Sequence, residues 1–424
     1  MKTRRFLLVF ITTVISVISA FPQRDLVISG GNSVSSFVCN NRKVYTWGNN
    51  KTDAGTGLLG TGGAADYYTT PQPVIFPINP DTGVEYDIKQ VNSGSGAHFV
   101  ALDCYNEVWA WGNNSLGQVG NGTVSGQDGF VDEPSKVLTL PEIDAAYKNA
   151  SGELINASVV YAGNNTSFAI LDNGDLVSWG ANGKGFSNEG YDDAYGQLGN
   201  GVLPADGVAA NQPRAGYVKV PGGGTLTDVI EVFAGDNIAM ALVDPDGDGV
   251  GTLYTWGDGK NGTLARDANG TTNPVSADEV KDPYARPARY ADGSIMDNIT
   301  AITLGDVFGA ALDEDGYVWT WGNGAWNNST GSTTTNYSGS DPRRVFAGTT
   351  TGASNDGTYL LAKSIGAGQG YGMAVAADGK PVAWGGGGCG DGGATGNGTT
   401  AGSNGVTEYI QYAPGSVHDD VILI

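Results

Sequence analysis

Short apolar runs that end in a Trp-Gly pair recur along this chain at intervals of 63 to 77 residues. The residues before each tryptophan are β-branched, aromatic or aliphatic and alternate with small ones, which is typical of a β-strand. Glycine after the tryptophan permits a positive φ where the strand turns away. The pairs are Trp47-Gly48, Trp111-Gly112, Trp179-Gly180, Trp256-Gly257, Trp321-Gly322 and Trp384-Gly385. A fixed period of this kind indicates a repeat architecture with six units.

Two further markers accompany each Trp-Gly pair. A glycine lies 16 to 21 residues upstream, and an apolar strand with an Asp-, Asn- or Gly-rich turn separates it from the tryptophan, which predicts a β-hairpin. A segment close to Pro-x-x-Val follows the pair at a variable distance. The glycines are Gly30, Gly94, Gly163, Gly235, Gly305 and Gly368, and the prolines are Pro71, Pro134, Pro213, Pro287, Pro342 and Pro414. We therefore expect about four short strands and one long loop in each unit.

One such sheet cannot bury both of its faces alone, whereas units packed side by side in a ring can. The prediction is an all-β fold, a β-propeller of six blades that are four-stranded antiparallel sheets. Residues 98–122 resemble the repeat of the regulator of chromosome condensation family, and Tyr195-Gly196-Gln197-Leu198-Gly199-Asn200-Gly201 repeats the second half of that motif. The resemblance covers nearly all of the chain after its first residues. It implies the propeller fold, and it makes seven blades the alternative because the founding member has seven.

The first 20 residues resemble a secretory signal peptide rather than part of the fold. A basic start, Met1-Lys2-Thr3-Arg4-Arg5, precedes an apolar run that is shorter than a membrane span, and Ser19-Ala20 offers a cleavage site. The alternative is an uncleaved N-terminal anchor. We expect residues 1–20 to be removed, residues 21–424 to form the propeller without a membrane span, and the protein to be secreted or displayed at the cell surface.

The charge balance narrows the range of partners. Aspartate and glutamate number 44 against 22 lysines and arginines, so the net charge is −22. A surface this acidic repels nucleic acid and anionic membranes. The chromatin binding that the resemblance implies is therefore not expected in this chain. The guanine-nucleotide exchange that it implies is not expected either, because an exported protein would not meet the small-GTPase partner. We predict a binding or structural module and not an enzyme.

Asp244-Pro245-Asp246-Gly247-Asp248-Gly249 is the sharpest local motif. Three carboxylates at alternate positions before glycine are able to wrap a hard cation with oxygen ligands. An EF-hand is excluded because Thr255 occupies the twelfth position, where a glutamate is needed. Two interpretations stay open: a solvated Asp-Gly turn, which needs no metal, and a calcium loop within a β-hairpin, with Asp244, Asp246 and Asp248 as ligands. No other cofactor is expected.

The cysteines and histidines offer little catalytic chemistry. Cys39 and Cys104 lie in matching hairpins of neighbouring units, so export would permit a disulfide between them, and reduced thiols are the alternative. Cys389 has no equivalent. His98 occupies a repeat position and is expected to pack in the core, and His418 has no visible partner. No Gly-x-Ser-x-Gly elbow accompanies either histidine, so a catalytic triad is not predicted.

The loops after the Trp-Gly pairs differ in length and sequence, and variable loops on a rigid scaffold are typical of recognition surfaces. Their aromatic side chains are the predicted contacts for an extracellular protein or glycan. These residues are Tyr67, Tyr68, Phe130, Phe186, Tyr191, Tyr284, Trp326 and Tyr337. The apolar run 421–424 resembles the strand that opens each unit, so we expect it to add to a sheet edge of the same molecule. The alternatives are donation of this strand to a neighbouring molecule, which would build a self-assembly, and a longer ring. The rival function is a hydrolase or lyase that acts on extracellular polysaccharide.

Overall fold

The computed structural model describes residues 28–31, 33–183, 186–187, 190–191, 195–203, 211–259, 262–266, 281–305, 308–323, 338–347, 359–368, 371–385 and 408–409. Nearly all regular structure within these residues is β-strand, in agreement with the all-β prediction. The strands form six four-stranded antiparallel sheets and two two-stranded ribbons, together with one short 3₁₀ helix, η1 (Ala145–Tyr147). The predicted signal peptide and the run 421–424 lie outside the described residues.

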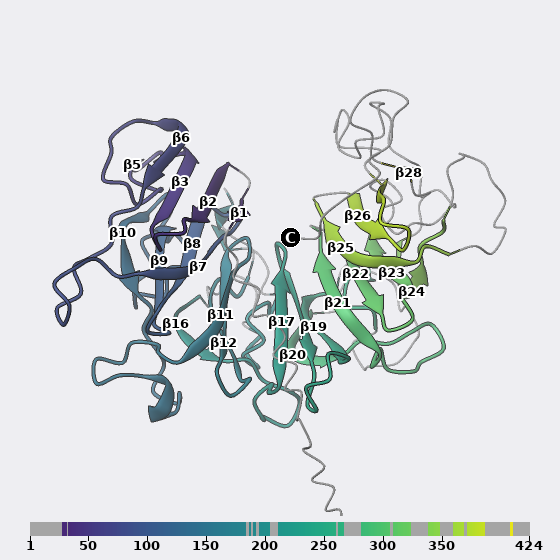
Figure 1. The fold of residues 1–424 in the computed structure, drawn as a ribbon. Coiled ribbons are helices and arrows are strands. Elements are labelled where there is room, and N and C mark those ends of the chain that lie inside the picture. Colours follow the sequence, from purple (N-terminus) through teal and green to yellow (C-terminus); the bar gives the residue numbers. More distant parts are fainter. Residues whose placement is uncertain are drawn as a thin grey trace, which may run out of the picture.

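The six sheets follow one another along an arc in chain order (Figure 1). Each is an antiparallel meander whose first strand is innermost and contacts the first strand of the next sheet. The innermost strands are β1 (Ile28–Gly30), β7 (Ile88–Ser93), β11 (Ala157–Ala162), β17 (Val229–Ala234), β21 (Ile299–Leu304) and β25 (Ala362–Ala367). The second strands are β2 (Val34–Val38), β8 (His98–Asp103), β12 (Thr166–Leu171), β18 (Ile238–Val243), β22 (Phe308–Asp313) and β26 (Tyr371–Ala376).

The Trp-Gly pairs lie on the third strand of every sheet, as the repeat predicts. These strands are β3 (Val44–Asn49), β9 (Val108–Asn113), β13 (Leu176–Gly180), β19 (Thr252–Asp258), β23 (Val318–Asn323) and β27 (Pro381–Gly385). The glycine is required at Gly180, because φ is +107° and a Cβ would lie 2.5 Å from the carbonyl oxygen of Asn165. The tryptophan is thereby placed on one sheet face just before the chain turns.

The proline segments form the outermost strands, where a missing N–H does not interrupt the sheet. These strands are β6 (Tyr67–Pro73), β10 (Phe130–Lys136), β16 (Gln212–Tyr217), β20 (Lys281–Pro287), β24 (Ser338–Arg344) and β28 (Glu408–Tyr409). Pro414 lies outside the described residues. The two ribbons, β4 (Lys51–Thr52) with β5 (Gly55–Thr56) and β14 (Phe186–Ser187) with β15 (Gly190–Tyr191), belong to the long loops of the first and third units.

Apolar joints hold neighbouring sheets together. Trp111, Trp179, Trp256, Trp321 and Trp384 have no exposed surface, and each belongs to a core cluster that it shares with the preceding sheet. Polar contacts reinforce the joints near the centre. The side-chain oxygens of Gln90 and Asn92 accept hydrogen bonds of 2.9 and 2.8 Å from backbone N–H groups of β11. The core therefore consists of successive layers between the sheets.

The outward faces of the first and last sheets differ from these joints. In β2 and β3, Phe37, Tyr45 and Trp47 are half-exposed, whereas the residues between them face the second sheet and are buried. The pattern recurs on the sixth sheet, where Tyr371 and Met373 of β26 are half-exposed. The intervening strands β8, β12, β18 and β22 are buried throughout. Among the described residues, no sheet covers these two faces as the inner joints are covered.

Candidate functional site

Four exposed apolar side chains lie within one stretch of the first unit, one at the start of β6 and three in the loop after this strand. Tyr67 on β6 has 68 % of its surface exposed, and Ile75, Ile78 and Val84 in the following loop have 52 to 60 % exposed. These four residues are called the outer-edge patch below. Exposure of large apolar side chains to water is unfavourable in free energy. A group of such side chains is typical of a protein-binding surface. The patch is therefore a candidate recognition surface.

The other predicted contact residues are less accessible. Tyr68 is half-buried and packs against the first core cluster. The half-buried rings of Phe130 and Tyr284 lie against glycines of the preceding unit, Gly57 and Gly201 respectively. Phe186 and Tyr191 lie in the β14–β15 ribbon, and Trp326 and Tyr337 lie outside the described residues. Of the predicted contacts whose side chains are described, Tyr67 alone is largely exposed.

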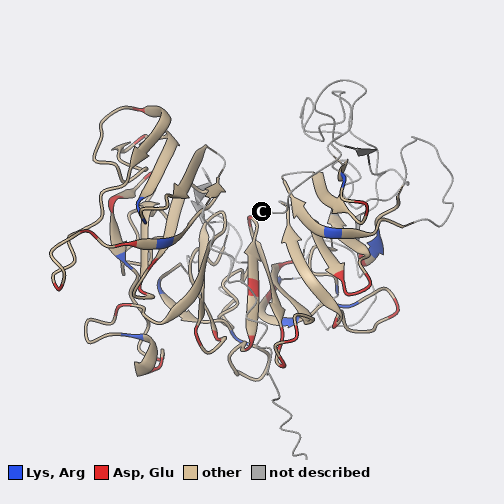
Figure 2. Ribbon diagram, in the orientation of Figure 1, with Lys and Arg blue, Asp and Glu red and all other residues tan. Residues whose placement is uncertain are grey.

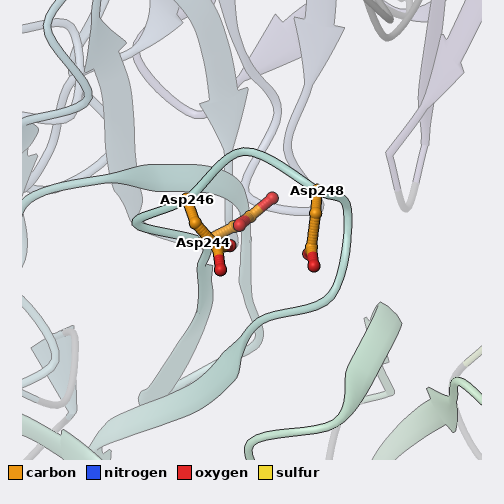
Figure 3. A group of neighbouring side chains, drawn as sticks. All are labelled: Asp244, Asp246 and Asp248. Carbon is orange, nitrogen blue, oxygen red and sulfur yellow. The ribbon is translucent and has the colours of Figure 1, made fainter.

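The three predicted metal ligands share the turn between β18 and β19 (Figure 3). One oxygen from each of Asp244, Asp246 and Asp248 lies within 4.8 Å of the others. Asp244 is buried, and its carboxylate accepts hydrogen bonds of 2.9 and 2.8 Å from the backbone N–H groups of Gly247 and Gly249. The pKa of Asp246 is raised by its hydrogen bond to Asp244 and by the charge of Asp248. The hydrogen bonds to Asp244 thus fix the conformation of the turn. The three clustered carboxylates concentrate negative charge that a bound cation would neutralise.

The predicted disulfide is absent from the structure, in which Cys39 and Cys104 are free thiols. The N–H of Cys39 donates to the carbonyl of Lys43 and closes the hairpin between β2 and β3. The N–H of Cys104 donates instead to the carbonyl of Asp87, just before β7, and burial raises the pKa of the Cys104 thiol. Cys389 lies outside the described residues.

His98 lies in the core, as its repeat position predicts. It is fully buried, and its Nε2 lies 3.0 Å from the hydroxyl oxygen of Ser167 in the third sheet. Burial lowers the pKa of His98 to about 4. The imidazole is therefore neutral at pH 7 and contributes to the joint between the second and third sheets. His418 lies outside the described residues.

Negative charge is spread over the turns and strand ends, and few basic residues interrupt it (Figure 2). No helix among the described residues has the length and apolar character needed to cross a membrane. The acidic surface favours partners that carry positive charge.

Sequence reasoning missed a cluster that recurs on the outer parts of two sheets. In the second sheet, the ammonium of Lys136 lies 3.9 Å from the ring centre of Trp109, and the indole N–H of Trp109 donates to Asp103 at 2.8 Å. Glu107 and Asp103 neutralise Lys136. The shared Val-Trp-x-Trp-Gly sequence of β9 and β23 was the signal that could have revealed the pair of clusters.

The fifth sheet carries the matching cluster beside a pocket of about 350 Å³. The guanidinium of Arg344 lies 3.8 Å from the ring centre of Tyr317 and 4.9 Å from that of Trp319. The indole N–H of Trp319 donates to the buried Asp313 at 2.7 Å. The pocket is lined by Tyr290, Ala291, Asp292, Asn298, Asp313, Asp315, Trp319, Pro342 and Arg344.

The sequence matches two models of the regulator of chromosome condensation repeat, one at residues 88–118 and 158–185 and the other at residues 105–170. These segments contain the second and third strands of the second and third sheets. Residues 88–185 of this chain therefore carry the regulator of chromosome condensation repeat. The matches include two of the tryptophans that form the joints, Trp111 and Trp179.

Relatives with curated descriptions share modest identity with the chain. It is 28 % identical over 307 residues to the human E3 ubiquitin-protein ligase HERC2, which covers 72 % of this chain but only 5 % of HERC2. It is 28 % identical over 226 residues to the protein pim1 of Schizosaccharomyces pombe, covering 52 % of this chain and 34 % of pim1. The chain thus spans a small part of these relatives.

Solved structures support the same fold. Human WBSCR16 superposes with a TM-score of 0.62 at 21 % identity, covering 91 % of this chain and 83 % of the other. Yeast RCC1 (Prp20), in its complex with Kap60, gives a TM-score of 0.55 at 20 % identity over 86 % and 66 % of the two chains. A further structure of Prp20p from Saccharomyces cerevisiae is described together with its binding to Gsp1p and histones. Identity this low supports the fold alone.

Proposed function

We propose that this chain is an exported protein-binding module that recognises its partner through the outer-edge patch of the first unit. The observation that carries the proposal is the exposure of Tyr67, Ile75, Ile78 and Val84 on one strand and the loop after it. The repeat family supports it, because yeast RCC1 is described in complex with Kap60. The fold offers a rigid frame, and the patch offers the contact chemistry.

The composition of the patch suits a protein rather than a small ligand. Tyrosine is enriched in interfaces because one ring supplies a large contact area and a hydroxyl group with few rotatable bonds. The three aliphatic side chains of the following loop would be buried on binding, at about 25 cal/mol for each Å² removed from water. Asp66 and Glu85 flank the stretch, and each is ion-paired with a lysine, Lys51 at 2.9 Å and Lys43 at 3.0 Å. A partner with an apolar contact face fits this surface.

Export rests on the first 20 residues, whose basic start and short apolar run are those of a signal peptide. If the chain is exported in this way, its partner is a secreted protein or a protein of the cell surface. Self-assembly through 421–424 remains a prediction, because that segment lies outside the described residues.

The number of blades in the complete ring is a proposal as well. Six sheets are described, and the uncovered faces of the first and sixth favour the seven-bladed alternative over direct closure between them. The half-exposed Trp47 would then insert against a seventh sheet as Trp111 inserts against the first.

Complex formation and catalysis are separated by one pair of measurements. Immobilised full-length chain is exposed to the culture medium of the source organism, and the captured protein is purified and mixed again with fresh chain. In parallel, the chain is incubated with a panel of extracellular polysaccharides and reducing ends are counted. We expect a complex of defined stoichiometry and no new reducing ends. Polysaccharide cleavage without a reconstituted complex would replace this proposal with the hydrolase or lyase.

A further inference from the structure

The cation–aromatic cluster occurs in the second sheet, with Lys136 and Trp109, and in the fifth sheet, with Arg344 and Trp319. The two clusters differ at one position that lies next to the cation. Glu107 in the second sheet and Tyr317 in the fifth both lie two residues before the first tryptophan of the third strand. Glu107 neutralises Lys136. Tyr317 instead lies flat against the guanidinium of Arg344. The substitution therefore removes one of the two carboxylates that neutralise the cation in the second sheet, and keeps Asp313 as the counterpart of Asp103.

Arg344 is left with unused hydrogen-bonding capacity. Its flat face is covered by rings, with Tyr359 as the third at 5.6 Å. Its Nε is buried without a hydrogen-bond partner, and no carboxylate within the described part of the chain lies in ion-pair distance of it. A guanidinium held between rings presents its edge in a fixed orientation, which matches the two oxygens of a carboxylate.

The pocket lining also carries oxygen acceptors. Asp292 and Asp315 are exposed, and Asn298 is half-buried. Asp292 already accepts hydrogen bonds from Ser294, which keep its pKa below the usual range. Burial raises the pKa of Tyr290, so its hydroxyl stays protonated and donates to Asn298. The lining of the pocket thus combines one guanidinium, several oxygen acceptors and aromatic rings.

We propose that this pocket binds a hexuronic acid residue of an acidic glycan, with its carboxylate on Arg344 and its hydroxyl groups on Asp292, Asp315 and Asn298. A carboxylate uses the free edge of the guanidinium, and neighbouring ring hydroxyls supply the donors that the rim carboxylates accept. The rings of Tyr290 and Trp319 provide the apolar contact that ligand pockets typically have. A phosphate or sulfate is disfavoured, because its higher charge density would meet three aspartates.

This inference is independent of the protein-binding proposal, since the outer-edge patch lies on the first sheet and the pocket on the fifth. Its test uses the full chain and D-glucuronate as the probe in a ligand-observed NMR titration. D-glucose is the neutral control, and L-glutamate is the carboxylate without ring hydroxyls. We expect saturable binding of glucuronate, and binding of both controls that is weaker by about tenfold or more, since a hydrogen bond to a charged group has that effect.

Three variants assign the binding to the pocket. Arg344→Gln is expected to weaken glucuronate binding about tenfold or more, whereas Lys136→Gln, which changes the matching residue of the second sheet, leaves it unchanged. Tyr317→Glu restores the second-sheet arrangement and should abolish binding by neutralising Arg344 internally, without removing the guanidinium. Thermal unfolding verifies that each variant is folded.

The proposal is overturned if glucuronate does not saturate the wild-type chain, or if folded Arg344→Gln and Tyr317→Glu both bind it as the wild type does. It is also overturned if L-glutamate binds as tightly as glucuronate, because the site would then recognise an acidic peptide.

Discussion

The indole N–H of Trp179 donates a hydrogen bond of 2.9 Å to the carbonyl oxygen of Gln118, which lies in the loop between β9 and β10 of the preceding unit. Trp256 and Trp321 make the same bond across the next two joints, at 2.9 and 2.8 Å. Each of these three tryptophans therefore packs into the core cluster that it shares with the preceding sheet, and its indole N–H pairs with a backbone carbonyl of a loop in the preceding unit. The stability of this repeat protein depends on such nearest-neighbour joints as well as on the sheets themselves.

Trp179→Ala should lower the free energy of unfolding by about 3–5 kcal/mol, the usual range for deleting a large buried aromatic side chain. Trp47→Ala is the matched control, because Trp47 occupies the same repeat position but is half-exposed on the uncovered face. Its cost should be clearly smaller. Urea denaturation of both variants measures the difference, and equal costs would show that the face of the first sheet is covered in solution.

Gly120→Ala should be more destabilising than Gly126→Ala. The two glycines have nearly the same φ, +77° and +78°, so both variants carry the same backbone strain, about 1–2 kcal/mol. At Gly120 the new Cβ would also lie 2.7 Å from the ring of Trp179, whereas at Gly126 it meets no atom within 4 Å. Chemical denaturation compares the variants. Indistinguishable values would mean that the turn does not press on the tryptophan as described.

Calcium should raise the thermal midpoint of the wild-type chain, because an ion that binds only the folded turn stabilises it by mass action. Asp246→Ala should abolish the shift, since it removes one of the three clustered carboxylates. Asp175→Ala changes the corresponding hairpin turn of the third sheet and should leave the shift intact. Scanning calorimetry with excess calcium and with chelator provides the comparison, and coincident midpoints for the wild type would remove calcium from the account.

Stability should fall as the pH decreases from about 6.5 towards 4, because the folded pKa of His98 is about 4 and the reference value is 6.5. In that pH interval, the imidazole of the unfolded chain binds a proton and the buried imidazole of the folded chain does not. The loss of stability is therefore complete below pH 4 and absent above pH 6.5. Each pKa unit of difference between the folded and unfolded states corresponds to about 1.4 kcal/mol, so the total loss in the free energy of unfolding is of the order of 3 kcal/mol. Denaturation between pH 5 and 7 avoids most carboxylate titration. His98→Asn should flatten the slope there, and an unchanged slope would assign it to other groups.

Much of the fold was predictable because its determinants are local and repeated. Trp-Gly pairs ended third strands as predicted, and prolines marked edge strands because an edge tolerates a missing N–H. The glycine upstream of the first Trp-Gly pair was predicted one residue too early, because Gly31 and not Gly30 is equivalent to Gly94. A Cβ on Gly31 would lie against the carbonyl of Gly94, and a Cβ on Gly94 would lie against the carbonyl of Gly163 in the same way. A turn one residue shorter than assumed explains the displacement.

The candidate sites were less predictable, because they depend on contacts between distant residues. The chain pattern showed Phe130 and Tyr284 as loop aromatics, but their exposure depends on glycines of the preceding unit, which their rings cover. The exposed aliphatic residues of the outer-edge patch carry no motif. Arg344 and Trp319 meet only when β23 and β24 pair. The acidic turn at Asp244 was visible because its residues are adjacent in sequence.

The outer-edge patch is tested most directly by titrating the purified captured partner into three forms of the chain in a calorimeter. The forms are the wild type, the double variant Tyr67→Ser with Ile78→Ser, and Ile230→Ser, which removes a comparably exposed isoleucine from β17. The account predicts that the double variant binds at least about tenfold more weakly, since truncating central interface residues typically costs more than about 1 kcal/mol each. The control should match the wild type. Equal affinity of the wild type and the double variant would contradict the assignment of this surface.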